Sequence, residues 1–482
     1  MKSRIEWLSL VVAAALVAAC ADMQGLAPQA SLTKADALAS KQSLASTPLD
    51  AAAWPTTDWW KSLGDPQLDQ LMSEALAGSP TLKVAAARTR QALALAQVAK
   101  APLYPQIDGS FSSTYQRFSE HGLFPPPFAG NWNSVNQLQI SLNWELDFWG
   151  KNRSAYEAAL GQARAAEVDE YAARLALSTS IAQAYVQMQR AYLQRDVAEK
   201  TLREREQIYA LTRDRNEAGI DSRLELKQAE SALPATREAI TQFNETIELT
   251  RNQIAALLGQ GPDRGRAMAR PGASPLAAVA LPSNIPADLL GRRPDLIAQR
   301  WRVEAARHEI DSAKAEFYPN VNLLAFVGLS NIGSAFFSSG NRVAGLGPAI
   351  TLPIFEGGRL RGNLAGTDAQ YDIAVEQYNQ TLADALRDVV DQLASFRSVG
   401  VQREEQKQAL ATTAEAYNIA LLRYREGIGN YLQVLSAEQP YLDQESLDAD
   451  LQARELALSI NLVRALGGGY QNPASTATAS VQ

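Results

Sequence analysis

The fold of this chain is decided by the stretch Gln137-Leu138-Gln139-Ile140-Ser141-Leu142-Asn143-Trp144-Glu145-Leu146-Asp147-Phe148. Apolar and polar residues alternate along it. An extended strand would therefore carry one apolar face that ends in aromatic residues and a second face without any apolar residue. Membrane barrel strands have this pattern because lipid covers one side and water the other. A strand of a soluble sandwich alternates in a similar way, so the surrounding sequence has to decide between the two.

The chain carries its ground plan twice. Leu103-Tyr104-Pro105-Gln106-Ile107-Asp108 returns 214 residues later as Phe317-Tyr318-Pro319-Asn320-Val321-Asn322. Phe148-Trp149-Gly150 returns as Phe355-Glu356-Gly357, and Ala218-Gly219-Ile220 returns 208 residues later as Glu426-Gly427-Ile428. Solenoid repeats are only 20–50 residues long, so a period near 210 residues indicates a duplicated domain.

Each half contains only two stretches with strand periodicity. The expected strands are residues 106–116, 136–148, 320–330 and 345–355, which form the hairpins 106–148 and 320–355. Bacterial membrane barrels need at least about eight strands. An unpaired strand edge is not tolerated in lipid, so four strands with a lipid-facing side predict an oligomer, and three copies would supply twelve strands.

The alternation also assigns the two faces of this sheet. We expect a lipid-facing side made of Ile107, Phe111, Tyr115, Leu138, Ile140, Leu142, Trp144, Val321, Leu323, Ala325, Ile350, Leu352 and Ile354. On the other side we expect Asp108, Gln139, Asn143 and Glu145 to line a water-filled lumen, in which a carboxylate is more simply a wall residue than a catalytic acid or base.

Long helices follow each hairpin. Residues 151–217 contain no proline, and at 1.5 Å per residue they form about 100 Å of helix. Charges recur throughout, so this helix does not cross a membrane, and its length is typical of a coiled coil. A turn at 217–222 leads into a helix to about 258 with an expected kink at Pro234, so the first helical hairpin spans 151–258. The second hairpin repeats this over 358–466, with its turn at 425–430.

The N-terminus has the features of an exported lipoprotein. A short basic start precedes an apolar run too short to cross a bilayer, and then comes Val17-Ala18-Ala19-Cys20, which contains the only cysteine of the chain. This predicts a signal peptide over 1–19 and a lipid on Cys20, in an arrangement that resembles a bacterial lipobox. By resemblance to sorted lipoproteins, Ala21 favours the outer membrane. Residues 20–65 would be a lipidated, flexible tether and an N-terminal equatorial segment.

Composition excludes several classes of function. The net charge of −7 gives no reason to expect nucleic-acid binding. The two histidines lie far apart in sequence, which argues against a histidine metal site or a serine-histidine catalytic site, so we expect no enzyme, no metal and no cofactor apart from the lipid. The two structural repeats would span 66–259 and 284–467, with a linker at 260–283 and a disordered tail at 468–482.

Eight motifs in order resemble those of one known family. They are the lipobox, Trp59-Trp60 with Asp65-Pro66-Gln67-Leu68, Tyr104-Pro105, Trp144 to Gly150, Arg293-Pro294-Asp295-Leu296, Phe317-Tyr318-Pro319, Leu352 to Arg359, and Arg423 to Gly427. The chain resembles the TolC-type outer-membrane factors, and among them the NodT lipoproteins of resistance-nodulation-division (RND) efflux systems.

The resemblance implies a mainly α-helical homotrimer, with a twelve-stranded β-barrel in the outer membrane and a twelve-helix α-barrel in the periplasm. It implies a passive conduit that exports drugs or other small toxic compounds, together with a periplasmic adaptor protein and an RND inner-membrane transporter. The alternative is the outer-membrane channel of a type I protein secretion system, which uses the same fold.

By the same resemblance, the two turns at the far end of the long helices would form a periplasmic tip that contacts the adaptor. The candidates are Ala218, Gly219, Ile220, Asp221, Ser222, Glu426, Gly427, Ile428, Gly429 and Asn430. The gate would involve Tyr424, Arg425, Gln433 and Ser436. Relatives often have an arginine at position 429 or an aspartate at 436. Here glycine and serine stand there, so we expect closure to rest on packing and hydrogen bonds around Tyr424, Arg425 and Gln433.

Overall fold

We describe the fold from a computed structural model, in which residues 23–34, 37–39, 54–272 and 291–471 are described. The chain divides into two compact units. Unit 1 contains Met1–Leu32, Arg88–Glu167 and Ala298–Asn379, and unit 2 contains Thr33–Ala87, Val168–Ile297 and Gln380–Gln482. Cys20, the signal peptide and most of the expected C-terminal tail lie outside the described residues. Among the residues described, no helix is both long enough and apolar enough to cross a bilayer.

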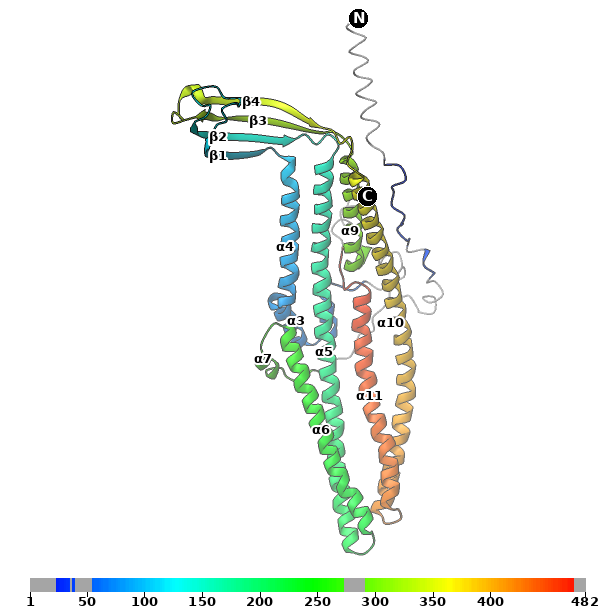
Figure 1. The fold of residues 1–482 in the computed structure, drawn as a ribbon. Coiled ribbons are helices and arrows are strands. Elements are labelled where there is room, and N and C mark those ends of the chain that lie inside the picture. The colour runs from blue at the N-terminus through cyan, green and yellow to red at the C-terminus, as the bar shows by residue number, and fades with distance from the viewer. Residues whose placement is uncertain (1–22, 35–36, 40–53, 273–290, 472–482) are drawn as a thin grey trace. The chain divides into compact units, whose positions relative to one another are not determined.

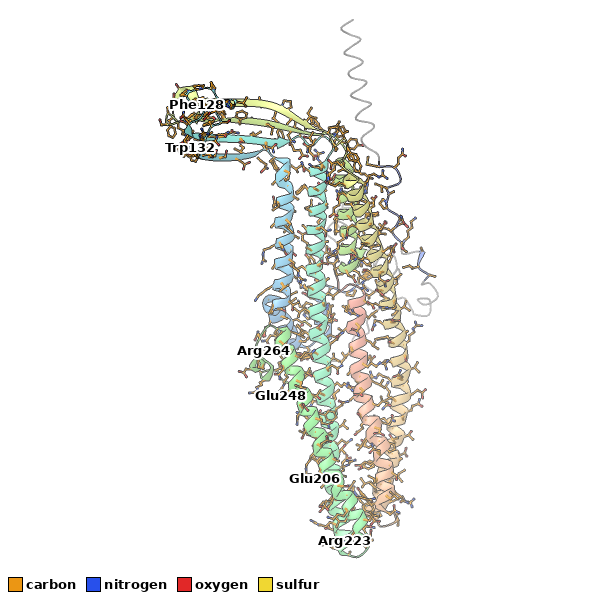
Figure 2. The ribbon with its side chains drawn as sticks, in the orientation of Figure 1. Phe128, Trp132, Glu206, Arg223, Glu248 and Arg264 are labelled. Atoms are coloured by element: carbon orange, nitrogen blue, oxygen red, sulfur yellow. The ribbon has the colours of Figure 1, made fainter. Side chains whose placement is uncertain are left out.

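Unit 1 contains one antiparallel sheet with the strand order β1-β2-β3-β4 (Figure 1). The strands are β1 (Gln106–Arg117), β2 (Trp132–Glu145), β3 (Asn320–Ile332) and β4 (Arg342–Thr351). Figure 2 shows Phe128 and Trp132 at the loop end of this sheet. All four strands expected from the sequence are therefore present, although their ends differ by up to four residues.

The strand register places the predicted apolar residues on one face. Ile107 is opposite Leu142, Leu142 is opposite Ala325, and Ala325 is opposite Leu346. Directly opposite residues share a face, so the alternating pattern continues across the sheet. Of the thirteen predicted residues, Leu352 and Ile354 follow the end of β4 rather than lying within it.

The opposite face is less polar than β2 alone indicates. Asp108, Gln139 and Asn143 lie on it, but β3 adds Leu324 and Phe326, both about two-fifths exposed. Phe326 lies opposite Gly345, and a Cβ atom at Gly345 would come within 2.5 Å of the Phe326 ring. The glycine is required because the aromatic ring occupies the space above it.

The register also refines the internal repeat. Ile107 pairs with Leu142, and its counterpart Val321, 214 residues later, pairs with Ile350. The structural counterpart of Leu142 is therefore Ile350, at an offset of 208 residues. The Phe-X-Gly motifs lie 207 residues apart, one residue out of step with the sheet.

Strand β2 ends three residues before the predicted position because the next residues begin a helix. The carboxylate of Asp147 accepts hydrogen bonds from the backbone N–H groups of Asn152 and Arg153, at 3.2 and 2.8 Å. Gly150 adopts a positive φ of 76°, which turns the chain into α5 (Lys151–Glu217). Leu146 still donates its backbone N–H to the Val321 carbonyl at 2.8 Å, and Phe148 lies in the turn.

The helical part of unit 1 is formed by segments of α4 (Pro80–Lys100), α5, α9 (Pro294–Ala315) and α10 (Arg359–Arg425). Helices α5 and α9 approach closely at Gly161, where a Cβ atom would lie 3.0 Å from that of Ala305. The Arg164 guanidinium lies 4.7 Å from the centre of the Trp301 ring on the neighbouring helix. Small residues and this cation–π contact therefore hold the two helices together.

The start of the tether is docked rather than free. The Asp372 carboxylate on α10 accepts hydrogen bonds from the backbone N–H groups of Gln29 and Ala30, at 2.9 and 2.8 Å. Met23 and Leu26 pack against a buried cluster that includes Leu364. The expectation of a flexible tether is therefore wrong for these residues, because α10 supplies both an acceptor and an apolar surface.

Unit 2 is built from long helices around a buried core. It contains η2 (Trp59–Leu63), α3 (Pro66–Gly78), α6 (Arg223–Leu257), α7 (Pro262–Arg266), α11 (Tyr431–Ala465) and the remaining parts of α5 and α10. Asp65 caps α3, because its side chain accepts hydrogen bonds from the backbone N–H groups of Gln67 and Leu68. Helix α7 lies in the expected linker, and Arg264 within it forms an ion pair with Glu74.

The predicted tail begins too early. Tyr470 is buried and packs on Tyr171, with ring centroids 5.1 Å apart. Gly467, Gly468 and Gly469 all have positive φ, and a Cβ atom on any of them would lie within about 2.2 Å of another atom. These glycines are therefore fitted to a tightly packed site, although the sequence alone suggests flexibility.

Candidate functional site

The candidate site is formed by the two turns that join α5 to α6 and α10 to α11, at the lower end of Figure 1. Both turns use the same local chemistry. Gly219 and Gly427 take the left-handed conformation after their helices, with φ of 73° and 77°. Ser222 and Asn430 then cap the following helices through the backbone N–H groups of Leu224 and Gln433. Figure 2 marks the first turn by Arg223.

Each turn presents one large apolar side chain. Ile220 is 64% exposed and Ile428 is 68% exposed, and the two occupy equivalent positions in the repeats. Ala218, Glu426 and Gly427 are also exposed. The side chains or backbone of these residues are therefore exposed on the surface of the chain, and contact with an adaptor stays a prediction.

Asp221 differs from the other predicted contact residues because it faces inward. Its side chain is only 7% exposed and receives two hydrogen bonds from Arg215, at 2.9 and 3.2 Å. The hydroxyl of Tyr424 donates a third hydrogen bond to Asp221, at 2.6 Å. The assignment of Asp221 as an adaptor contact is thus corrected, since its carboxylate is used inside the chain.

Tyr424 is the centre of this arrangement. It is fully buried, and the Thr212 hydroxyl lies 2.8 Å from its own. Arg215 stacks 4.7 Å from the centre of the Tyr424 ring and also donates to its backbone carbonyl, at 3.2 Å. We call Arg215, Asp221, Tyr424 and Thr212 the tip brace. It joins the first turn to the end of α10.

Two members of the tip brace, Tyr424 and Arg215, have raised pKa values. Burial, with a contribution from the hydrogen bond to Asp221, raises the pKa of Tyr424 to about 12. The hydrogen bonds that Arg215 donates to Asp221 also raise the pKa of the Arg215 guanidinium. Arg215 and Tyr424 therefore keep their protonation states throughout the acid and neutral range.

The other predicted gate residues do not join this group. Arg425, Gln433 and Ser436 are all exposed, and the Ser436 hydroxyl donates to the Leu432 carbonyl of its own helix. Hydrogen bonds do surround Tyr424, but its partners are Arg215, Thr212 and Asp221 rather than Arg425 and Gln433, and a role of this group in closure stays a prediction. Sequence reasoning missed Arg215 and Thr212 because they meet Tyr424 only after the long helices have folded side by side.

A second polar layer lies further along the same helices. Arg205 on α5 forms a bidentate ion pair with Glu438 on α11, at 2.9 and 3.1 Å, and also donates to the Thr236 hydroxyl. Lys200 donates to Tyr441 and Glu445, both at 2.6 Å. The Tyr441 ring stacks on that of Tyr417 at 5.4 Å. These contacts fix α5 and α11 relative to each other in unit 2.

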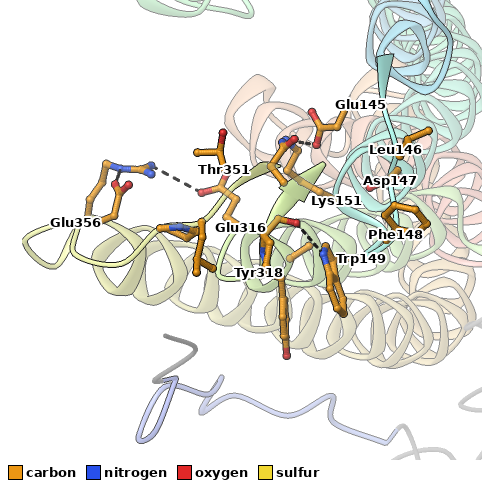
Figure 3. Close-up of a pocket in the computed structure, with 16 residues that line it drawn as sticks. Glu145, Leu146, Asp147, Phe148, Trp149, Lys151, Glu316, Tyr318, Thr351 and Glu356 are labelled. Atoms are coloured by element: carbon orange, nitrogen blue, oxygen red, sulfur yellow. Dashed lines mark hydrogen bonds and ion pairs between the residues drawn. The ribbon is translucent and has the colours of Figure 1, made fainter. Parts of the chain in front are cut away.

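A cavity of about 320 Å³ lies where the strands meet the helices in unit 1 (Figure 3). Glu145, predicted to line the lumen, forms an ion pair with Lys151 there, at 2.6 Å. The Trp149 indole donates to the Pro319 carbonyl at 2.9 Å and stacks on Tyr318, with ring centroids 4.7 Å apart. Trp149 of the first repeat is therefore joined to the second repeat by one hydrogen bond and one aromatic stack, and the ion pair lies within the first repeat.

Comparisons with known proteins identify relatives across most of the chain. A family profile described as outer membrane efflux protein matches residues 71–260 and 285–468. The fusaric acid resistance protein FusA of Burkholderia cepacia is 41% identical over 368 residues, covering 75% of this chain and 69% of FusA. The multidrug resistance outer membrane protein MdtP of Escherichia coli K12 is 33% identical over 88% of each chain. The crystal structure of VceC from Vibrio cholerae has a TM-score of 0.82 at 37% identity, covering 87% of this chain and all of VceC.

Proposed function

Since this chain belongs to the outer membrane efflux protein family, we propose that it is the outer-membrane channel of a tripartite RND-type pump that exports small toxic compounds. The family membership confirms the resemblance to TolC-type factors, the fold class and the outer-membrane location that the sequence predicts. Its relatives are channels rather than enzymes.

The observation that carries this function is the four-stranded sheet with one continuous apolar face. Ile107, Leu142, Ala325 and Leu346 run across that face in register. Four strands cannot close a barrel, so a homotrimer supplies the remaining strands. The channel then acts as a passive conduit, and its cargo is of the class exported by pumps for drugs and small toxic acids, as the names of MdtP and FusA suggest.

The tip provides the contact with a periplasmic adaptor protein. The accessible residues of the two turns form the docking surface, with Ile220 and Ile428 as its apolar centres. Exposed apolar side chains at the end of a polar helical hairpin suit a protein partner, because their burial on binding is favourable. Asp221 supports this surface from inside by fixing the first turn.

The lipid on Cys20 is part of the same proposal. Intact-mass analysis of the membrane-extracted protein should show a chain that begins at residue 20 and carries a diacylglyceryl group and a further acyl chain. A mature N-terminus at another residue, with a free thiol, would contradict it.

A complementation experiment tests the function. The gene is expressed in a strain that lacks its own outer-membrane efflux channel, together with a periplasmic adaptor and an RND transporter from the same genome. We expect lower accumulation of a fluorescent efflux substrate and restored resistance. Restored secretion of a type I protein substrate, without any change in efflux, would favour the alternative channel function.

A further inference from the structure

The sheet of unit 1 ends in two strands that are each paired on one side. Among the described residues, β1 pairs with β2 only and β4 pairs with β3 only. Within a membrane each free edge must find a partner, because unpaired backbone groups are too costly in lipid. This requirement rests on the proposed function, and it calls for a second copy of the chain at each edge.

The internal repeat supplies a template for that contact. Between β2 and β3 the first repeat meets the second, with Leu142 opposite Ala325. At the boundary between two copies, the second repeat would meet the first. The counterpart of Leu142 is Ile350, 208 residues later, and the counterpart of Ala325 is Phe111, 214 residues earlier.

We propose that β4 of one protomer pairs antiparallel with β1 of the next in this single register. Ile350 then lies opposite the partner's Phe111, and Leu346 lies opposite the partner's Tyr115. All four residues belong to the apolar face. A slip of one residue would place polar positions of one strand beside the apolar positions of the other, so the lipid-facing surface itself selects against odd shifts.

The charges at the strand ends point to the same register. In the first repeat, Lys151 at the start of α5 forms an ion pair with Glu145 at the end of β2 (Figure 3). The residue 208 positions after Lys151 is Arg359, which is also a cation. The residue 208 positions after Glu145 is Pro353, so the second repeat has no acidic residue at that position.

In the proposed register, an acidic residue of the neighbouring copy takes the position that Glu145 has in the first repeat. Glu145 lies opposite Asn322, whose counterpart in the first repeat is Asp108. In the proposed register the partner's Asp108 therefore lies opposite Pro353, within reach of Arg359. Arg359 is 61% exposed and already contacts Glu356, and its five N–H donors allow it to take a further carboxylate. The ion pair of the first repeat thus becomes an ion pair between subunits.

Paired cysteines test the register in the full-length protein. The variants Phe111→Cys/Ile350→Cys and Tyr115→Cys/Leu346→Cys place thiols directly opposite each other. The swapped combinations Phe111→Cys/Leu346→Cys and Tyr115→Cys/Ile350→Cys use the same four sites but lie four residues out of register, about 13 Å apart along the strand. Disulfides need Cα atoms within about 7 Å, so mild oxidation of outer-membrane fractions should yield roughly tenfold more covalent dimer and trimer for the in-register pairs.

Single-cysteine variants serve as controls and account for the native Cys20. Cross-linking of either swapped pair, or of neither in-register pair in protein that migrates as an SDS-resistant trimer, would overturn the proposed register. If the in-register pairs cross-link but the protein fails the efflux complementation, the register stands and the proposed function falls. If efflux is restored and the cross-links follow another register, only this inference falls.

A double-mutant cycle tests the intersubunit ion pair. Asp108→Asn and Arg359→Gln should each lower the temperature at which the trimer dissociates in SDS, and the double variant should be no worse than the weaker single variant. Combining Asp108→Asn with Glu74→Gln should give additive shifts, because Glu74 pairs with Arg264 in unit 2 and shares no partner with Asp108. Additive shifts for Asp108→Asn with Arg359→Gln would show that the two residues do not meet.

Discussion

The substitution Tyr424→Phe isolates the hydrogen bonds of the tip brace. It keeps the ring under Arg215 but removes the hydroxyl that donates to Asp221 at 2.6 Å and lies 2.8 Å from Thr212. A hydrogen bond to a charged group contributes about 1.5–3 kcal/mol, and Asp221 keeps its two bonds from Arg215. The equilibrium between the braced turn and a released turn should therefore shift by about ten- to a hundredfold in each protomer.

Tyr417→Phe is the matched control. Tyr417 is also a buried tyrosine of this helix bundle, but among the described residues its hydroxyl has no hydrogen-bond partner. Removing that hydroxyl therefore breaks no bond, and replacing a buried unpaired polar group by an apolar one is neutral or stabilising. Both variants lose one oxygen atom, and only one loses the brace.

Single-channel recordings in planar bilayers compare the two variants. We expect Tyr424→Phe to show a higher open fraction or conductance than the wild type, Tyr424→Ala to show a larger rise, and Tyr417→Phe to behave as the wild type. Equal conductance of Tyr424→Phe and the wild type, in trimers of unchanged thermal stability, would refute a role of the brace in holding the tip closed. An equal rise in both tyrosine variants would refute the specific role of the Asp221 bond.

Four further predictions concern the membrane face, the pH response and the packing of the fold. Leu142→Arg should destabilise the inserted protein by about 2–4 kcal/mol if position 142 lies near the bilayer midplane, as measured by urea unfolding in lipid vesicles. Asn143→Arg, on the opposite face, should be tolerated. The reverse result would show that the lipid-facing and lumen-facing sides of the sheet are assigned the wrong way round. Wild-type conductance should change little between pH 4 and 7, because Tyr424 and Arg215 keep the protons that they donate in the brace. A steep rise on acidification would show instead that protonation of a carboxylate, Asp221 included, releases the tip. Burial and the nearby negative charges of two glutamates raise the pKa of Glu204, so its ionisation opposes folding as the pH rises through that pKa; Glu204→Gln should therefore raise the melting temperature at pH 7 but not at pH 4. Gly467→Ala should cost at least about 1–3 kcal/mol in thermal unfolding because of its φ of 88° and a Cβ contact at 2.1 Å, whereas Gly261→Ala, with open space around it, should be nearly neutral.

The sheet could be predicted from the sequence because its signal is local. The alternation around Leu142 extends over a dozen residues, and the duplication predicts the second hairpin from the first. The end of β2 could not be predicted in the same way. Asp147 continues the alternation as written, but its carboxylate caps α5 instead of extending the strand. A residue that satisfies two local patterns is assigned only by the backbone groups that its side chain meets in the folded chain.

The tip brace and the C-terminal glycines were missed for a different reason. Arg215 and Tyr424 are separated by about 200 residues, and nothing near either one in sequence indicates their contact. Gly467 to Gly469 have the composition of a flexible tail, yet each fits a place where a side chain would collide with another segment. Contacts that depend on the path of distant segments leave no periodic signal in the sequence.

The tip brace also breaks the twofold equivalence that the repeat would otherwise impose. At an offset of 208 residues, the position equivalent to Asp221 is Gly429, which has no side chain to receive an arginine. One hairpin of each protomer therefore ends in a turn with an internal ion pair, and the other ends in a turn whose equivalent position has no side chain. Around a ring of three protomers the two kinds alternate, so identical ligand molecules that bind at every turn would meet two classes of site. Their binding isotherm should then resolve into two affinities, even though one ligand binds to a channel built from identical protomers.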